Sequence, residues 1–231
     1  MASGENYRGR LKHLIKGLVF DFDGLILDTE TVQFEALQWL YSQYGQSLSL
    51  DIWGECIGTD HEFDPIKHLR EITGSETSEE ELRETYLSRF QERIAQEGPL
   101  PGVGDYLREA KQMGLGLAVA SSSPSNWVHG FLVDKGLIEW FDVICTADDV
   151  ENVKPDPALY RLAVQRLEIA PNEAVAFEDS PNGALAAVRA GLYCVVIPNS
   201  VTANLNFGEY DLKLTSLADL PLKQLLESAV K

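Results

Sequence analysis

Two aspartates, Asp21 and Asp23, directly follow a short apolar run and come just before Gly24. The run Leu18 to Phe20 is typical of a buried strand, and the glycine permits the sharp turn that would end it. Because side chains alternate along a strand, both carboxylates are expected on one side of its carboxyl end. Ligands bind at that end in open α/β sheets. The spacing favours a metal ion and a nucleophile, although Asp and Gly also form ordinary turns.

A serine-rich turn, Ser121-Ser-Ser123, follows the predicted strand Gly116–Ala120 and precedes a predicted helix. Hydroxyl and backbone N–H groups at such a turn can bind an anionic oxygen. Serines at this place also cap helices. The turn by itself does not separate these two roles.

One lysine, Lys154, lies among acidic residues after the predicted strand Phe141–Cys145. A lysine is normally solvated at the surface of a protein. This one directly precedes Pro155, and Pro157 follows two residues later. Held rigidly by these prolines, it could instead deliver one positive charge to a defined point.

A second pair of acids, Glu178 and Asp179, follows the predicted strand Ala174–Phe177. Carboxylates at a strand end could ligate a hard cation such as Mg²⁺. They could equally stabilise the start of the next helix, where negative charge is favourable. Both alternatives stay open for this pair taken alone.

The elements that must position these residues alternate between two patterns from Pro99 onward. Short apolar runs separate amphipathic segments, as a parallel sheet with crossover helices requires. The predicted strands are 18–20, 116–120, 141–145, 174–177, 193–197 and a weaker edge strand at 212–214, and the predicted helices are 103–113, 126–135, 157–167 and 182–190. Gly191 suits a C-terminal helix cap and Pro157 a first helical turn. The sequence therefore predicts an α/β fold with a three-layer, Rossmann-like parallel sheet.

The segment from about residue 31 to residue 98 has helical patterns and no strand pattern. Helices are predicted at 31–44, 65–72 and 79–96, the last behind the N-cap signal of Thr77 and Ser78. An all-helical cap therefore interrupts the core just after its first strand, where it is well placed to cover the acidic strand end. The predicted division is a catalytic core at 15–30 and 99–225, a helical cap at 31–98 and an N-terminal extension at 1–14.

Composition narrows the possible partners. The 231 residues include 36 acidic and 19 basic side chains, a formal charge of −17, which repels the phosphate backbone of nucleic acids. A small phosphorylated ligand stays possible, because a metal ion and one buried lysine can reverse the potential locally. No segment approaches membrane-spanning length, so no membrane partner is expected, and a monomer is the default.

The compartment is expected to be the cytoplasm. The N-terminal stretch to Lys16 is polar and basic, which argues against a secretory signal. The three cysteines, Cys56, Cys145 and Cys194, lie far apart and match no metal or redox spacing. An odd number without a disulfide framework favours a reducing compartment.

Taken together, these residues resemble the haloacid dehalogenase-like phosphohydrolases. The chain resembles in particular the subgroup with a helical cap after the first strand. This subgroup includes β-phosphoglucomutase and sugar-phosphate phosphatases. The resemblance covers about residues 17 to 220. Its four signatures read here as Asp21-Phe-Asp-Gly-Leu-Ile-Leu-Asp28, Ser121, Lys154 and Glu178-Asp179.

The resemblance implies a role for each signature in phosphoryl transfer. Asp21 would be the nucleophile and form an aspartyl-phosphate intermediate, and Asp23 would protonate the leaving alcohol and later activate water. Ser121 and the backbone N–H of Ser122 would hold the phosphoryl oxygens, and Lys154 would supply positive charge. The implied substrate is a small phosphorylated metabolite.

The resemblance also implies Mg²⁺ as cofactor. Asp21, Glu178 and Asp179 would supply acidic oxygens, with Glu178 binding directly or through water, and Asp23 would contribute its backbone carbonyl. Without cations, clustered acids would repel each other and a phosphate dianion, a conflict that Mg²⁺ and a lysine resolve. Asp28 is expected to support the turn after the first strand.

Three departures separate the chain from the phosphoglucomutase-like members. Pro124 stands where they carry a lysine, His61 at the place of an arginine in their cap loop, and Gln33 in place of a histidine. Losing two cationic groups removes an obvious means of holding a bisphosphate. Water is then the favoured acceptor, which predicts a phosphatase for a sugar phosphate or similar metabolite.

The alternatives are a β-phosphoglucomutase-type mutase and a non-catalytic phosphate-binding module. A haloacid dehalogenase is disfavoured because it lacks the second acid, which is present here as Asp23. His61 is itself expected to have a surface or structural role.

Overall fold

A parallel sheet forms the base of the protein in the computed structural model, which describes residues 14–54 and 63–229. Its six strands are ordered β3-β2-β1-β4-β5-β6. In chain order they are β1 (Gly17–Phe20), β2 (Gly116–Ala120), β3 (Val143–Cys145), β4 (Ala174–Glu178), β5 (Tyr193–Val196) and β6 (Leu212–Lys213). Every neighbouring pair is parallel, with β1 between β2 and β4. The predicted α/β class and all six predicted strands are confirmed.

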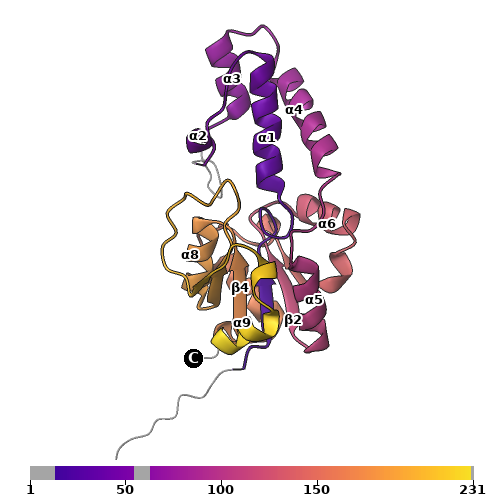
Figure 1. Ribbon diagram of the computed structural model, residues 1–231, viewed down its shortest axis with the longest axis vertical. Coiled ribbons are helices and arrows are strands. Elements are labelled where there is room, and N and C mark those ends of the chain that lie inside the picture. Colours follow the sequence, from indigo (N-terminus) through magenta and orange to yellow (C-terminus); the bar gives the residue numbers. More distant parts are fainter. Residues whose placement is uncertain (1–13, 55–62, 230–231) are drawn as a thin grey trace, which may run out of the picture.

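Helices cover both faces of this sheet (Figure 1). They are α5 (Val103–Gln112), α6 (Ser125–Asp134), α7 (Ala158–Arg166), α8 (Pro181–Ala190) and α9 (Leu222–Ala229). Leu18 and Phe20 pack with side chains of α5, α6 and α9, whereas Val19 between them packs with α7 and α8. This alternation along β1 follows from the two-residue period of a strand and buries the sheet on both sides.

The helical cap stands over the edge at which β1 ends (Figure 1). It contains α1 (Thr29–Gln43), α2 (Leu50–Gly54), α3 (Pro65–Thr73) and α4 (Glu79–Ile94). These helices enclose an apolar cluster of their own, formed by Phe34, Leu37, Leu40, Tyr41, Leu48, Ile66, Leu69 and Leu82. The cap therefore has a small core separate from the two that flank the sheet.

Helix ends follow the predicted signals with a few differences. Ser78 and Glu81 form a reciprocal capping box at the start of α4, and Gly191 ends α8 with a φ of 88°. Pro157 is the residue before α7, outside the first turn in which it was predicted. Asp28 accepts a hydrogen bond from the Thr31 backbone N–H at 3.1 Å, so it caps α1.

Two short helices, α2 and α9, were not predicted. They span five and eight residues, which is too short for a helical period to emerge from the sequence. Within the described ranges, no helix has the length and apolar character needed to cross a bilayer. Cys56 and His61 lie outside the described residues.

Candidate active site

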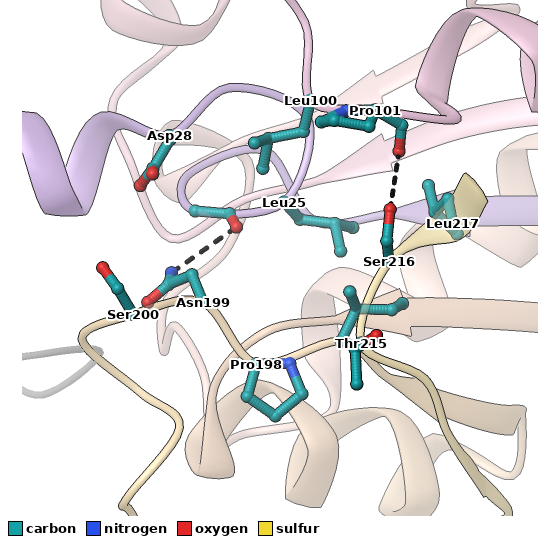
Figure 2. Close-up of a pocket in the computed structure, with 12 residues that line it drawn as sticks. Leu25, Asp28, Leu100, Pro101, Pro198, Asn199, Ser200, Thr215, Ser216 and Leu217 are labelled. Carbon is teal, nitrogen blue, oxygen red and sulfur yellow. Dashed lines mark hydrogen bonds between the residues drawn. The ribbon is translucent and has the colours of Figure 1, made fainter. Parts of the chain in front are cut away.

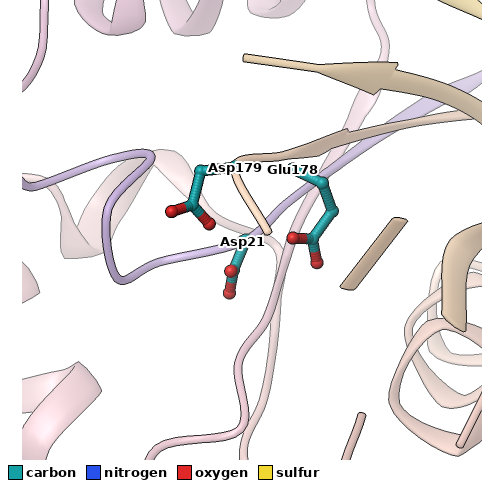
Figure 3. Close-up of side chains that lie close together, drawn as sticks. All are labelled: Asp21, Glu178 and Asp179. Atoms are coloured by element: carbon teal, nitrogen blue, oxygen red, sulfur yellow. The ribbon is translucent and has the colours of Figure 1, made fainter. Parts of the chain in front are cut away.

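Three carboxylates meet at the carboxyl ends of β1 and β4. Asp21, Glu178 and Asp179 are buried, and each offers an oxygen within 4.8 Å of the others. Figure 3 shows the three side chains close together at these strand ends. The sheet explains this meeting, because Phe20 is paired with Phe177 and the next residues therefore lie side by side. The Asp21 backbone N–H extends this pairing to the Phe177 carbonyl at 3.0 Å.

Lys154 reaches this cluster from the turn that precedes α7. Its Nζ lies 2.8 Å from Asp21 Oδ1 and 2.7 Å from Glu178 Oε1. The lysine is only 5% exposed, so it is not the solvated lysine that its sequence context would suggest by default. Burial alone would lower its pKa, but the charges of Asp21 and Glu178 outweigh burial and raise the pKa above its usual value. Lys154 therefore stays a cation inside the site.

A tyrosine that the sequence did not single out completes the surroundings of Glu178. The Tyr160 hydroxyl, from α7, donates to Glu178 Oε1, the oxygen that also accepts from Lys154. The other carboxylate oxygen, Oε2, accepts from the Ser180 hydroxyl at 3.3 Å. Burial, and then the charge of Glu178, raises the pKa of Tyr160 well above its usual value. Tyr160 thus acts as a neutral hydrogen-bond donor.

The cluster carries more negative charge than its lysine balances. Burial, followed by the neighbouring Glu178, raises the pKa of Asp21 well above its usual range, although Lys154 opposes this. Burial and then Glu30 do the same to the pKa of Asp179. In the described part of the chain, the Asp179 Oδ1 atom is buried and has no hydrogen-bond partner. Oxygen ligands, excess negative charge and an unsatisfied oxygen all fit a hard divalent cation.

Asn199 and Glu30 support Asp179 from outside the cluster. Asn199 Nδ2 donates to Asp179 Oδ2 at 2.8 Å and to Glu30 Oε2 at 3.1 Å. Burial raises the pKa of Glu30 to about 7, with Asp23 and Asp28 adding to the rise and Asn199 opposing it. Asn199 follows the end of β5, so the strand-end rule used for the other residues could have found it.

Two glycines leave room for the acids. Gly24 has a φ of 73°, and a Cβ at this position would collide with Asp179 Oδ2. A Cβ at Gly183, in the first turn of α8, would collide with the carboxylate of Glu178. Both positions therefore require glycine, one for backbone conformation and close approach, the other for close approach alone.

Asp23 lies beyond the end of β1 and its carboxylate is held apart from the three-acid cluster. Its Oδ1 accepts from the Thr29 hydroxyl at 2.7 Å and from the Trp127 indole N–H at 2.8 Å. Its Oδ2 accepts from the Ser123 hydroxyl at 2.6 Å and lies 3.4 Å from that of Ser121. The structure thus directs this carboxylate toward the serine-rich turn.

The serine-rich turn itself follows β2. The backbone N–H of Ser121 donates to the Cys145 carbonyl at 3.0 Å, and that of Ser123 donates to the Ser121 hydroxyl at 3.0 Å. Among the described residues, the Ser122 Oγ atom is buried without a hydrogen-bond partner. A serine that caps a helix would use its hydroxyl for the cap, whereas this hydroxyl has no partner. The turn therefore fits the binding of an anionic oxygen better than helix capping.

A separate hollow of about 300 Å³ lies beside this site (Figure 2). Its walls come from the turn after β1, from Leu100 and Pro101 at the return from the cap, and from the loops at 197–200 and 215–217. The three clustered carboxylates are not among its lining residues. The hollow therefore adjoins the place where cap and core connect, and it is distinct from the carboxylate cluster at the strand ends.

The fold and the site define the class of protein. The family model of the haloacid dehalogenase-like hydrolases matches residues 18–197, and the chain belongs to this family. The predicted membership and the predicted class of enzyme, a phosphohydrolase of this family, are confirmed.

Relatives that align with nearly the whole chain accompany this match. The chain is 49% identical over 214 residues to YhcW of Bacillus subtilis, which is named as a phosphatase, covering 93% of this chain and 97% of the relative. It is 32% identical over 215 residues to the phosphorylated carbohydrates phosphatase of Thermotoga maritima, covering 92% and 97%. The crystal structure of CbbY from Rhodobacter sphaeroides in complex with phosphate is 30% identical, with a TM-score of 0.70 over 90% of this chain and 96% of that one.

Proposed function

We propose that this protein is a Mg²⁺-dependent phosphatase that hydrolyses a small phosphomonoester, such as a sugar phosphate, through an aspartyl phosphate on Asp21. The observation that carries this proposal is the buried cluster of Asp21, Glu178 and Asp179 with Lys154 against it. Relatives support the substrate class, since one is named a phosphatase of phosphorylated carbohydrates and CbbY has been crystallised with xylulose-1,5-bisphosphate.

The cluster fits the cation. Asp21, Glu178 and Asp179 would hold Mg²⁺, and the unsatisfied Asp179 Oδ1 is the atom that most clearly lacks a partner without it. The backbone carbonyl of Asp23 is a further proposed ligand. When bound, the ion would neutralise negative charge on the acids and on the phosphoryl oxygens.

Asp21 would carry out the first half of the reaction. Its Oδ1 already accepts hydrogen bonds from the Phe22 backbone N–H at 2.7 Å and from Lys154, so we assign the attack on phosphorus to Oδ2. The phosphorus–ester oxygen bond breaks as the phosphorus–Oδ2 bond forms. Ser121, Ser122 and Lys154 would hold the phosphoryl oxygens during this transfer.

Asp23 would manage the proton in both halves. In the first half its carboxyl group gives a proton to the departing alcohol oxygen. In the second half the carboxylate takes a proton from a water molecule, whose oxygen attacks phosphorus. The bond between phosphorus and Asp21 then breaks, which releases inorganic phosphate and restores both aspartates.

The cap would select the substrate and exclude bulk water. Its separate apolar core supports the predicted division into a cap at 31–98 and a core at 15–30 and 99–225, which stays a prediction.

At two of the positions that depart from the mutases the chain carries neutral groups. Pro124 is the residue before α6 and offers no charge, and Gln33 Oε1 accepts a hydrogen bond from the Tyr86 hydroxyl at 3.4 Å within the cap. These neutral groups favour water over a second sugar phosphate as the acceptor.

A turnover screen over metabolite phosphates with Mg²⁺ tests the proposal, with Asp21→Asn as the control. Release of phosphate that depends on Asp21 would support it. Absence of turnover above the control across the whole panel would favour a phosphate-binding module. Glucose 6-phosphate formed from β-glucose 1-phosphate, with a trace of the 1,6-bisphosphate and faster than free phosphate, would instead establish the mutase.

A further inference from the structure

The carboxylate of Asp23 receives two hydrogen bonds on its Oδ1 atom, and one of them comes from an indole. Trp127 Nε1 donates at 2.8 Å and the Thr29 hydroxyl at 2.7 Å. An indole N–H is only a donor, so it cannot adjust to a proton on the oxygen that it faces. Together with Thr29, Trp127 thereby fixes the orientation of the carboxyl group from the side of Oδ1.

The second oxygen, Oδ2, lies on the other side of the carboxyl group, toward the serine-rich turn. Its partners are the hydroxyls of Ser123 at 2.6 Å and Ser121 at 3.4 Å. Hydroxyls can donate to an oxygen or accept from it. The hydrogen bonds on Oδ1 therefore turn Oδ2 toward the residues proposed to hold the phosphoryl group.

The position of the Trp127 ring is set by aromatic neighbours on both the core and the cap. Trp127 lies in α6, where its ring makes a T-shaped contact with that of Phe131 at a centroid distance of 4.8 Å and an angle of 78°. Its face stacks on Phe90 of the cap helix α4, at 5.5 Å and 14°. Such contacts restrict the ring, and hence the direction of its N–H, more than one hydrogen bond would.

We propose that Trp127 is a positioning residue that orients Asp23 for proton transfer and links this orientation to the cap through Phe90. The inference rests on the proposed function, since it assigns a partner to the acid of that reaction. Trp127 acts through Asp23, with which its indole N–H is in direct contact. Docking of α4 against α6 would then place both the substrate-covering helix and the proton donor.

The choice of leaving group provides a measurement that would not change if Trp127 had only a structural role. An alkoxide that departs from a sugar phosphate needs a proton, whereas p-nitrophenolate is stable without one. The kcat/KM value reports the first half of the reaction, up to the departure of the leaving group. A variant with a misplaced Asp23 should therefore lose far more kcat/KM on the sugar phosphate than on p-nitrophenyl phosphate.

Trp127→Phe is the main variant, because it removes the indole N–H and keeps a ring to stack on Phe90. The ratio compares the kcat/KM value for p-nitrophenyl phosphate with the kcat/KM value for the best sugar phosphate. We expect this ratio to rise about tenfold, which is a part of the rate that general acid catalysis contributes. Trp140→Phe is the matched control, since Trp140 packs against the same core at its edge and should leave the ratio unchanged.

Phe90→Leu separates the two parts of the proposal, because it keeps the indole N–H and removes the stacking surface. The same ratio should rise, by a smaller factor than in Trp127→Phe. Thermal unfolding of each variant shows whether it is folded, and Asp23→Asn gives the largest rise that the ratio can reach.

The possible failures are distinguishable. A wild-type protein without Asp21-dependent turnover would overturn the proposed function itself. Equal losses on both substrates in Trp127→Phe, or no loss on either, would overturn the positioning role while the phosphatase stands. A normal ratio in Phe90→Leu would overturn the link to the cap.

Discussion

The strand-end site and the helical cap are held in place in different ways. Asp21, Glu178 and Asp179 are at most 7% exposed and lie at the ends of adjacent strands, whose backbone pairing fixes their spacing. The cap has its own small core, and its buried side chains Val32, Ala36, Phe90 and Ile94 also pack into the core beside the sheet. Its contacts with the core domain include the stack of Phe90 on Trp127 and the hydrogen bonds from Lys135 Nζ to the carbonyls at the end of α4.

The difference separates two tasks. A charge cluster that carries out phosphoryl transfer needs fixed positions, which a buried parallel sheet provides. A cover that selects a substrate can instead vary in sequence, because its own apolar cluster is separate from the two that flank the sheet. Under the proposed function, the chemistry and the choice of substrate would be encoded in separate regions, and substitutions in each should have separate consequences.

The largest expected effect is that of Asp21→Asn. An amide cannot act as the nucleophile, so turnover should fall by about a thousandfold or more, the scale at which covalent catalysis contributes. Asp28→Asn is the matched control, because asparagine caps a helix about as well as aspartate. Steady-state phosphate release measures both, and equal losses in the two variants would contradict the assignment.

Leu69→Ala tests the independence of the cap. Leu69 is fully buried in the cap cluster, and its truncation should lower the free energy of unfolding by about 2–5 kcal/mol. Turnover of a sugar phosphate should fall more than turnover of p-nitrophenyl phosphate, because the strand-end site stays intact. Leu87→Ala, at a residue 45% exposed, should change stability by about 0.5 kcal/mol or less. Equal loss of both activities would show that the cap also shapes the site.

Addition of Mg²⁺ should stabilise the strand-end site and thus the protein. At a hundredfold excess over its dissociation constant, the ion should add about 2.7 kcal/mol to the free energy of unfolding. Removal by a chelator should reverse the gain, and Asp179→Asn should reduce it. Thermal unfolding with and without Mg²⁺ measures this, and an unchanged midpoint would contradict the metal assignment.

Gly183→Ala should have a smaller effect on stability that is specific to the site. The added methyl group would collide with the Glu178 carboxylate. Overpacking of this kind lowers the free energy of unfolding by about 1–3 kcal/mol. Gly130→Ala is the control, since a Cβ there meets nothing within 4 Å and alanine favours a helix. Chemical denaturation should show a loss for the first variant and no loss for the second. A stable and fully active Gly183→Ala protein would contradict the packing described for Glu178.

Much of the fold could be predicted from sequence because the strands are short apolar runs with clear punctuation. The approach of Asp21, Glu178 and Asp179 follows from one rule, that parallel strands end at one edge. The position of Lys154 was harder to predict, because nothing in its sequence context shows that the side chain is buried.

The supporting residues could not be predicted for a different reason. Tyr160 and Trp127 lie in amphipathic helices, where their rings match the apolar pattern and conceal the polar atom that matters. The hydrogen bonds to Glu178 and Asp23 depend on how α7 and α6 pack on the sheet. Such contacts between distant segments leave no local spacing to read.

The central claim is that Asp21 becomes phosphorylated during turnover. Rapid acid quenching of the enzyme with Mg²⁺ and a phosphate ester, followed by peptide mass spectrometry, tests this directly. The account predicts one transient phosphoryl group on the peptide that contains Asp21. Hydrolysis of the ester with no phosphorylated protein at any time, or with the phosphoryl group on another residue, would contradict it.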